Sequence, residues 1–191
     1  MSATCLDYEV LYADPPWQYE YSISNSRKIE NQYDTMTLEA IKALPIPAAK
    51  NSVLFMWTTA PKLKEAFEVL DAWGFNYRTC LVWDKLDIGM GYWFRNQHEL
   101  LLVAVKGTFS PPDTFNRISS VFRHKKTEHS EKPKAIRAMI ANWYPNSRKL
   151  ELFAREHIEG WDCFGNEVPT TTQLMLCVQT NHAHPIGANQ K

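Results

Sequence analysis

Five short and almost uninterrupted apolar runs constrain the fold of this chain more than any other feature of its sequence. They are EVLYA (9–13), SVLFMW (52–57), YRTCLVW (77–83), ELLLVAVK (99–106) and KLELF (149–153). Near-continuous apolar sequences of this length are typical of strands buried on both faces, as in a parallel sheet covered by helices. The runs therefore predict a sheet that lies between helical layers.

Helical periodicity separates several of these runs. Apolar residues recur three or four positions apart over 61–73 and over 133–143, which predicts two amphipathic helices. Gly74 provides a natural end to the first of them, and a weaker helix is expected over 38–44. Alternating strands and helices predict an α/β fold with an open, mostly parallel sheet.

The length and the charge of the chain restrict its organisation and its partners. A chain of 191 residues with 45% hydrophobic and 22% charged residues is typical of one folded domain. We expect this domain to span 1–168 and the aperiodic segment 169–191 to form a C-terminal tail. The 21 basic and 21 acidic residues leave a formal net charge of +0, which argues against a protein that holds nucleic acid by bulk charge.

The sequence contains no pattern that directs a chain to a membrane or to an oxidising compartment. It has neither a signal-peptide pattern nor an apolar run of about 18 residues, so we expect a soluble, cytoplasmic protein. The cysteines lack a CxxC pair, which argues against a disulfide framework and against a metal site. They are Cys5, Cys80, Cys163 and Cys177.

The tetrapeptide Asp14-Pro15-Pro16-Trp17 follows the first apolar run directly. Ligands of open α/β sheets bind beyond the carboxyl ends of the strands, so Asp14 lies where a catalytic carboxylate is expected. A tight turn capped by Asp14 explains Asp-Pro-Pro equally well, and it is Trp17 that favours a catalytic site. A carboxylate, a rigid backbone and a flat ring together suit the exocyclic amine of a nucleobase.

The lone pair of such an amine is delocalised into the ring, which makes the nitrogen a poor nucleophile. Hydrogen bonds from its two N–H groups to the Asp14 carboxylate and the Pro15 carbonyl would favour a pyramidal nitrogen with an available lone pair. Consecutive prolines fix φ at about −65° and so set the direction of that carbonyl. Trp17 could stack on the base or border an incoming methyl donor.

DPPW is followed in order by LFMW, WGF, LVAVKG, EKP, ELFAR and GNE, and with these motifs the chain resembles the MT-A70 family of adenine-N6 methyltransferases. The resemblance extends from Tyr8 to Glu167. It implies a Rossmann-like methyltransferase fold in permuted order, in which the catalytic motif precedes the cofactor motif. It also implies S-adenosylmethionine as the cofactor and the N6 amino group of adenine as the methyl acceptor.

The resemblance assigns roles to the residues that match the family's motifs. The catalytic positions are Asp14, Pro15, Pro16 and Trp17. Asp14 also adjoins the cofactor, whose other positions are Lys132, Glu151, Leu152, Phe153, Arg155, His157, Asn166 and Glu167. The positions around the target adenine are Tyr33 and Trp57, with the polar neighbours Asn96 and Glu99.

Without the resemblance, several of these residues have simpler interpretations. Glu151 and Arg155 would form a surface ion pair, and Lys132 would be a solvated residue of a charged loop. Trp57 and Trp83 belong to a chain with 13% aromatic residues and would pack in the core. For Trp83 we keep that interpretation.

The sequence departs from the family's pattern near the cofactor. Only 13 residues precede Asp14, so the acidic-apolar pair that family members carry ahead of the catalytic motif is absent or differently built. Ile158 replaces an asparagine that contacts ribose, and Glu167 replaces the glutamine of a GNQ motif. These departures concern the adenosine part of the cofactor and leave the catalytic motif whole.

A basic cluster is the candidate contact for the acceptor. Arg123, Lys125 and Lys126 lie in the long segment 110–132 with Arg117, and they form either a solvated loop or a set of phosphate contacts. An adenine inside a duplex would have to be flipped out or presented on a single strand. Because the chain has no net positive charge, a partner subunit or a second copy could supply further grip.

DNA is the expected acceptor, because compact, stand-alone relatives of this type usually act on DNA. RNA is the rival acceptor, and the sequence does not separate the two. A different class of function is that of a non-catalytic, nucleic-acid-binding subunit of a methyltransferase complex, and a related reaction is the methylation of cytosine N4. The intact DPPW motif favours the active enzyme, because inactive partners in the family lose it.

Overall fold

One sheet runs through the computed structural model, which describes residues 7–19, 35–91, 93–126 and 131–165. Its strands lie in the order β5-β3-β4-β2-β1-β6-β7. They are β1 (Tyr8–Ala13), β2 (Ala48–Thr58), β3 (Asn76–Asp84), β4 (His98–Lys106), β5 (Val121–Arg123), β6 (Lys149–Ala154) and β7 (Asp162–Gly165). Each apolar run forms one strand, as predicted, whereas the sequence does not predict the short strands β5 and β7.

The directions of the strands confirm a mostly parallel sheet. β1 pairs in parallel with both β2 and β6, β6 pairs in parallel with β7, and β3 pairs in parallel with β5. Among the described strands only β4 runs the other way, antiparallel to β2 and β3. The reversal follows from the connection, because the described residues between β3 and β4, 85–91 and 93–97, contain no crossover helix of the kind that a parallel pair needs.

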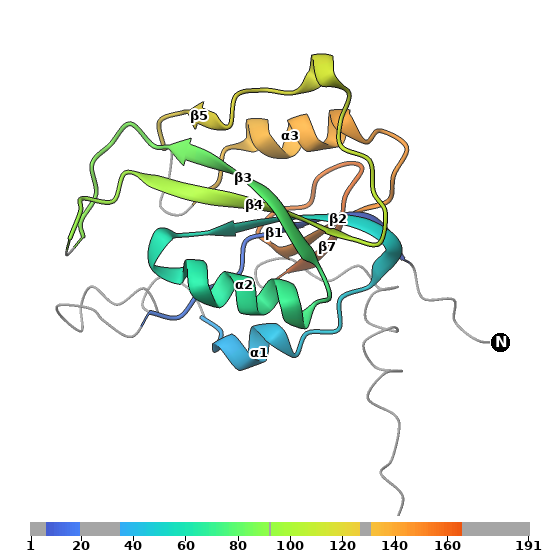
Figure 1. Cartoon of the computed structure of the whole chain (residues 1–191), viewed down its shortest axis with the longest axis horizontal. Coiled ribbons are helices and arrows are strands. Elements are labelled where there is room, and N and C mark those ends of the chain that lie inside the picture. Colours follow the sequence, from blue (N-terminus) through green and yellow to red (C-terminus); the bar gives the residue numbers. More distant parts are fainter. Residues whose placement is uncertain (1–6, 20–34, 92, 127–130, 166–191) are drawn as a thin grey trace, which may run out of the picture.

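Helices cover both faces of the sheet. The α-helices of the described residues are α1 (Leu38–Lys42), α2 (Leu63–Ala72) and α3 (Lys134–Trp143). α1 and α2 lie on one face of the sheet and α3 lies on the other (Figure 1). Gly74 ends α2 with a φ of 77°, a left-handed conformation that glycine adopts easily. The three predicted helices are therefore confirmed.

Both faces of the sheet are buried, which explains why the strand sequences are apolar throughout. Leu54 and Met56 of β2 pack with Leu70 of α2 on one face. Phe55 and Trp57 of β2 pack on the other face, in the cluster that α3 completes. Successive side chains of one strand therefore enter opposite cores, as the alternation of a strand requires.

The shared direction of the strands gathers functional segments at one edge of the sheet. The carboxyl ends of β1, β2, β3, β5, β6 and β7 lie at this edge together with the start of β4. We call it the carboxyl edge, and it lies on the left in Figure 1. Ligands of open α/β sheets bind at such an edge. The opposite edge is the one at which β2 begins and β4 ends.

Some predictions concern residues outside the described ranges. Most of the loop 18–33, the tail 169–191, Cys5 and Cys177 belong to this group. Cys80 is a free thiol that is half-buried, and Cys163 is buried. None of the helices within the described ranges is both long and apolar enough to span a bilayer.

Candidate active site

The segment Asp14–Trp17 makes a tight turn as the chain leaves β1. The backbone N–H of Trp17 donates to the Pro15 carbonyl at 2.9 Å, and that of Met36 donates to the Pro16 carbonyl at 2.9 Å. Trp17 is buried, and its indole N–H donates to the carbonyl of Trp57 at 3.3 Å. The turn is thus fixed to the end of β2, and the direction of the Pro15 carbonyl is set by the backbone.

Asp14 belongs to a chain of alternating charges. Lys132 Nζ lies 2.7 Å from Asp14 Oδ2 and 3.4 Å from Glu99 Oε2. Lys85 Nζ lies 3.1 Å from Glu99 Oε1. We call Asp14, Lys132, Glu99 and Lys85 the ion chain. It joins the end of β1 to the residues that follow β3 and begin β4, and its side chains are between 12% and 23% exposed.

The pKa values of the members of the ion chain are shifted in different directions. Burial raises the pKa of Asp14, and the attraction of Lys132 offsets this only in part. Burial works against the charged form of Glu99 too, but Lys132 and Lys85 outweigh it and lower the pKa of Glu99. Burial would lower the pKa of Lys132, yet Asp14 and Glu99 together raise it. Lys132 therefore stays cationic, and Asp14 is the carboxylate that takes up a proton more readily than an ordinary aspartate.

An aromatic floor lies beneath Lys132. Trp57 is fully buried, and its indole N–H donates to the hydroxyl of Tyr12 at 2.6 Å. Lys132 Nζ lies 6.0 Å from the centroid of the Trp57 ring, a distance at which a cation is attracted by the ring face. Trp83 meets Trp57 edge to face with 5.9 Å between their ring centroids. Trp57 therefore lies under the site, and Trp83 is a core residue as expected.

Glu151 of β6 is tied to α3 by a residue that the sequence does not single out. Arg137 Nη1 donates to both Glu151 oxygens, at 2.9 and 2.7 Å, and Arg137 Nη2 donates to Glu156 at 2.7 Å. The partner of Glu151 is thus Arg137, and the pair is buried, so the interpretation as a surface pair with Arg155 is wrong. The sequence offered one indication of this role, because Arg137 is a charged residue next to the apolar Ile136 in a predicted amphipathic helix.

The remaining cofactor positions surround the end of β6. Leu152 and Phe153 are buried, and Phe153 has a φ of 63°, which turns the backbone where the β6–β7 register shifts. Arg155 and His157 follow and are exposed. The positive charge of Arg155 acts on Asp14, where it offsets a small part of the effect of burial, which raises the pKa of that carboxyl. Tyr33, Asn166 and Glu167 lie outside the described residues.

The structure divides the basic residues between the two edges of the sheet. Arg123 ends β5 at the carboxyl edge and lies 3.5 Å from Asp84, and the exposed Lys125 and Lys126 follow it. Arg117 precedes β5, and its Nε donates to the Pro112 carbonyl at the opposite edge. Asn96, in the loop before β4, is half-buried at the carboxyl edge. Arg117 is therefore not a neighbour of the candidate active site.

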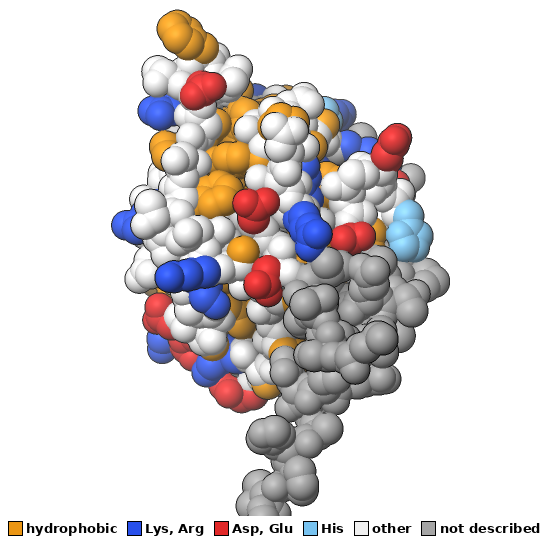
Figure 2. Space-filling model, turned by 90° about the vertical axis from the view of Figure 1, so that its right-hand side faces the viewer, with side chains coloured by type: hydrophobic (Ala, Val, Ile, Leu, Met, Phe, Trp, Pro, Cys, Tyr) orange, Lys and Arg blue, Asp and Glu red, His pale blue; other side chains and the backbone are white. Residues whose placement is uncertain are grey.

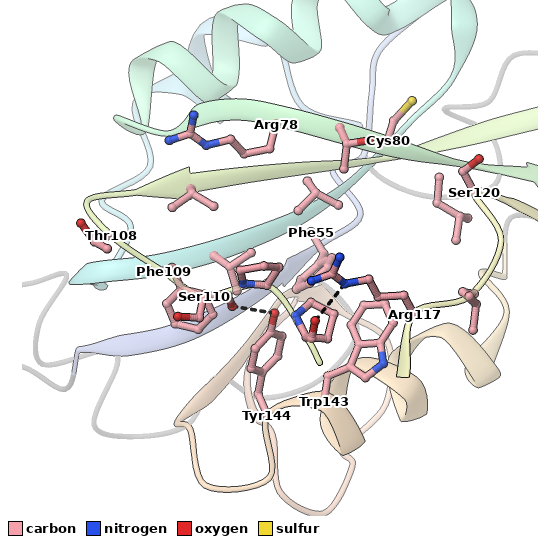
Figure 3. A pocket seen from close by; sticks show the side chains of 18 of the residues that line it. Phe55, Arg78, Cys80, Thr108, Phe109, Ser110, Arg117, Ser120, Trp143 and Tyr144 are labelled. Atoms are coloured by element: carbon pink, nitrogen blue, oxygen red, sulfur yellow. Dashed lines mark hydrogen bonds between the residues drawn. The ribbon is translucent and has the colours of Figure 1, made fainter. Parts of the chain in front are cut away.

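A cavity of about 720 Å³ lies away from the carboxyl edge. Hydrophobic side chains gather on the face that Figure 2 shows, which is the opposite edge of the sheet. β3 closes one side of the cavity with Arg78 and Cys80, and the end of α3 closes the other with Trp143 and Tyr144 (Figure 3). Tyr144 donates to the Ser110 carbonyl at 3.2 Å. The cavity contains none of the residues that the sequence predicts for catalysis.

Comparison with known proteins places this geometry in a family. A model of the MT-A70 family matches residues 8–167. The chain is 34% identical over 182 residues to the Type II methyltransferase M.MunI of a Mycoplasma species, which covers 85% of this chain and 78% of that protein.

Longer eukaryotic proteins match the same region. The chain is 30% identical over 174 residues to the human N(6)-adenosine-methyltransferase catalytic subunit METTL3, covering 84% of this chain and 28% of METTL3. The N(6)-adenosine-methyltransferase MT-A70-like protein of Arabidopsis thaliana is 30% identical over 172 residues, covering 84% of this chain and 24% of that protein. With its DPPW turn at the carboxyl edge and a family match over nearly all of its described residues, the chain belongs to the MT-A70 family.

Proposed function

We propose that this chain transfers the methyl group of S-adenosylmethionine to the N6 amino group of adenine in DNA. The observation that carries the proposal is the arrangement of Asp14 and Pro15 at the end of β1. Lys132 holds the Asp14 carboxylate at 2.7 Å, and the backbone of Trp17 fixes the Pro15 carbonyl at 2.9 Å. Two acceptors on neighbouring residues suit an amino group with two N–H donors.

The protein's part in the reaction is to position and deprotonate the amine. When bound, S-adenosylmethionine supplies a methyl group that leaves sulfur as the bond to N6 forms. Asp14 and Pro15 would accept the two N–H groups and so favour a pyramidal N6 with an available lone pair. Asp14 would then take the proton that the methylated nitrogen releases, because burial raises the pKa of its carboxyl.

The donors and charges at the carboxyl edge fit a ligand with a cationic sulfur and a ribose. Asp14 places a negative charge beside the end of β1. Arg155 and His157 are exposed just beyond β6, which pairs directly with β1. The side chains proposed to hold the cofactor are therefore Lys132, Arg155 and His157. Glu151, Leu152 and Phe153 at the end of β6 are also proposed to line the cofactor site. Asn166 and Glu167 complete the proposed cofactor positions.

The acceptor would approach from the β3–β5 side of the carboxyl edge. Arg123, Lys125 and Lys126 are exposed there and are proposed to contact phosphates. Asn96 and Glu99 lie at the start of β4 on the same edge and are proposed to contact the adenine. Trp57 is proposed to form the floor of the adenine site. Tyr33 is proposed to border the adenine from the loop that follows DPPW.

The match to the Type II methyltransferase M.MunI supports DNA as the acceptor. The chain is 34% identical to M.MunI over 78% of that protein, and 30% identical to the eukaryotic proteins named N(6)-adenosine-methyltransferases over about a quarter of their length. Compact, stand-alone relatives of the kind that the chain resembles usually act on DNA. RNA is the rival acceptor that the assay must include.

The test is a transfer assay with an isotope-labelled methyl group. The pure chain is incubated with labelled S-adenosylmethionine and unmethylated DNA, or with unmethylated RNA, and the product is digested to nucleosides. We expect label in N6-methyldeoxyadenosine. Label in N6-methyladenosine of RNA alone would correct the acceptor, and label in cytosine would correct the target base. No label with any substrate would refute the proposed function.

A further inference from the structure

The loop between β3 and β4 presents large apolar side chains to solvent. Ile88 is 62% exposed, Met90 69%, Trp93 94% and Phe94 84%. We call the described residues 86–91 and 93–97 the apolar loop. Large apolar side chains are scattered singly over most protein surfaces, but a cluster of them marks a binding surface.

The apolar loop has a defined backbone structure. The N–H of Gly89 donates to the Asn96 carbonyl at 2.8 Å, and Arg95 Nε donates to the Gly89 carbonyl at 2.6 Å. A Cβ at Gly89 would lie 2.7 Å from the Asn96 carbonyl oxygen, and one at Gly91 would collide with the carbonyl oxygen of Phe94. The two sides of the loop therefore approach so closely that only glycine fits. Internal hydrogen bonds hold the apolar side chains outward.

The base of the apolar loop is anchored at the carboxyl edge. Asp84 at the end of β3 accepts hydrogen bonds from the Leu86 backbone at 3.0 Å and from the Gln97 side chain at 2.8 Å. Lys85 and Glu99 flank the loop, and both belong to the ion chain that ends at Asp14. The loop is thus a neighbour of the proposed catalytic carboxylate and is linked to it by three ion pairs.

The charges around the apolar loop favour nucleic acid as its partner. Arg95 and Asp87 lie within the loop and balance each other in charge, and Arg123 pairs with Asp84 at its base. The exposed Lys125 and Lys126 that follow Arg123 leave these surroundings with a net positive charge. In a chain of net charge +0, this local positive charge beside aromatic rings suits phosphates next to bases. A duplex substrate also needs such a device, because flipping an adenine leaves a gap in the base stack.

We propose that the apolar loop is a wedge that enters double-stranded DNA beside the target adenine, with Trp93 and Phe94 filling the place of the flipped base. Apolar side chains inserted between base steps unstack and kink a duplex in this manner. The inference rests on the proposed function for the identity of the acceptor. It adds that the substrate is a duplex and that base extrusion depends on this loop.

The first test compares duplex and single-stranded DNA. Trp93→Ala combined with Phe94→Ala is expected to lower kcat/KM on duplex DNA about tenfold or more, since stacking on an aromatic ring is lost. On the same DNA after strand separation, the loss is expected to stay within about twofold, because no base must be extruded. Phe115→Ala is the matched control, since Phe115 is a fully exposed aromatic residue of a short 3-10 helix before β5, and it should change neither value. Equal losses on both substrates, or no loss on duplex, would overturn the proposal.

A second measurement does not depend on methyl transfer. A wedge unwinds DNA, so saturating protein should shift the topoisomers of a closed circular plasmid relaxed by a topoisomerase. We expect the shift with wild type and with Phe115→Ala, but not with the double variant. If wild type transfers no methyl group yet shifts the topoisomers, the proposed function fails and the wedge stands. If wild type gives no shift, the wedge is refuted whatever the activity.

The apolar loop could instead join two copies of the chain, and the mass in solution decides this. Light scattering without DNA is expected to give the same mass for wild type and the double variant. A wild-type dimer that becomes a monomer in the double variant would make the loop a self-association surface and would overturn the proposal.

Discussion

The two edges of the sheet bury different kinds of groups. At the carboxyl edge, Asp14, Lys132 and Glu99 are largely removed from solvent and are stabilised by one another. At the opposite edge, an apolar cavity of about 720 Å³ lies between β3 and the end of α3, where Trp143 and Tyr144 donate to backbone carbonyls. The cavity thus lies at one edge of the sheet, and the largely buried carboxylates and the lysine that pairs with them lie at the other edge.

The difference follows from the direction of the strands. A parallel sheet brings the residues at the ends of its strands to one edge, so Asp14, Asp84 and Arg155 lie along the same edge although they are distant in sequence. The opposite edge receives the starts of the same strands and the loop that crosses from β4 to β5. The proposed active site of this chain is therefore identified by its chemical groups and not by the volume of a cavity.

The largest expected effect is a loss of methyl transfer on substitution at the carboxyl edge. Asp14→Ala should lower methyl transfer by roughly a thousandfold or more, because it removes both an acceptor of the amine and the proton acceptor. Unfolding by denaturant should show that the variant still folds, since Lys132 keeps Glu99 as a partner. A variant with more than a tenth of wild-type activity would contradict the assignment of Asp14.

The next effect concerns the free energy of unfolding and the buried ion pair between α3 and β6. Arg137→Ala should lower the free energy of unfolding by about 3–5 kcal/mol, because it leaves Glu151 buried without its partner. Replacing both residues with methionine should recover much of this loss. Denaturant unfolding measures each variant. If the single and double variants are equally unstable, the pair contributes through packing and not through its charges.

A smaller effect concerns the ionisation of the ion chain. Asp14 must be ionised to act, so kcat/KM should fall as the pH drops through its pKa, which burial raises above the ordinary 3.8. Lys132→Met removes the charge that opposes this rise, so the acid limb should move to higher pH. Lys134→Met is the control, because Lys134 is exposed and pairs with Glu131 and Glu156. If the acid limb does not move, the charge of Lys132 does not control the ionisation of Asp14.

The smallest effect tests the opposite edge. Tyr144→Phe removes the hydrogen bond to the Ser110 carbonyl and should cost about 1 kcal/mol or less of unfolding free energy. Burial raises the pKa of Tyr144 to about 12, so its hydroxyl keeps its proton and donates at neutral pH. Methyl transfer should not change. A loss of activity in this variant would show that the two edges are coupled.

The sequence predicts the fold well because burial leaves a direct trace in it. Five apolar runs give five strands, and Gly74 marks the end of α2. The reversal of β4 is not predictable from its run, because burial on both faces determines composition and not direction. β5 and β7 are missed because three or four residues of mixed character carry no periodic signal.

The site is predictable only where its residues form a local motif. DPPW locates the turn after β1 from the sequence alone. The contact between Lys132 and Asp14 joins positions 118 apart, and only the fold brings them together. Arg137 carries no motif, since its role depends on the carboxylate of β6 beneath α3. The family resemblance supplied Lys132 and could not supply Arg137.

The reversal of β4 has a consequence for how such an enzyme can diversify. A strand that returns directly beside β3 leaves a hairpin tip at the carboxyl edge, where a crossover helix would otherwise be part of the hydrophobic core. Residues 86–97 can therefore be shortened, lengthened or exchanged without rebuilding either core cluster. Grafting this segment from one relative onto another would therefore test whether it sets the target preference while the sheet and the DPPW turn stay unchanged.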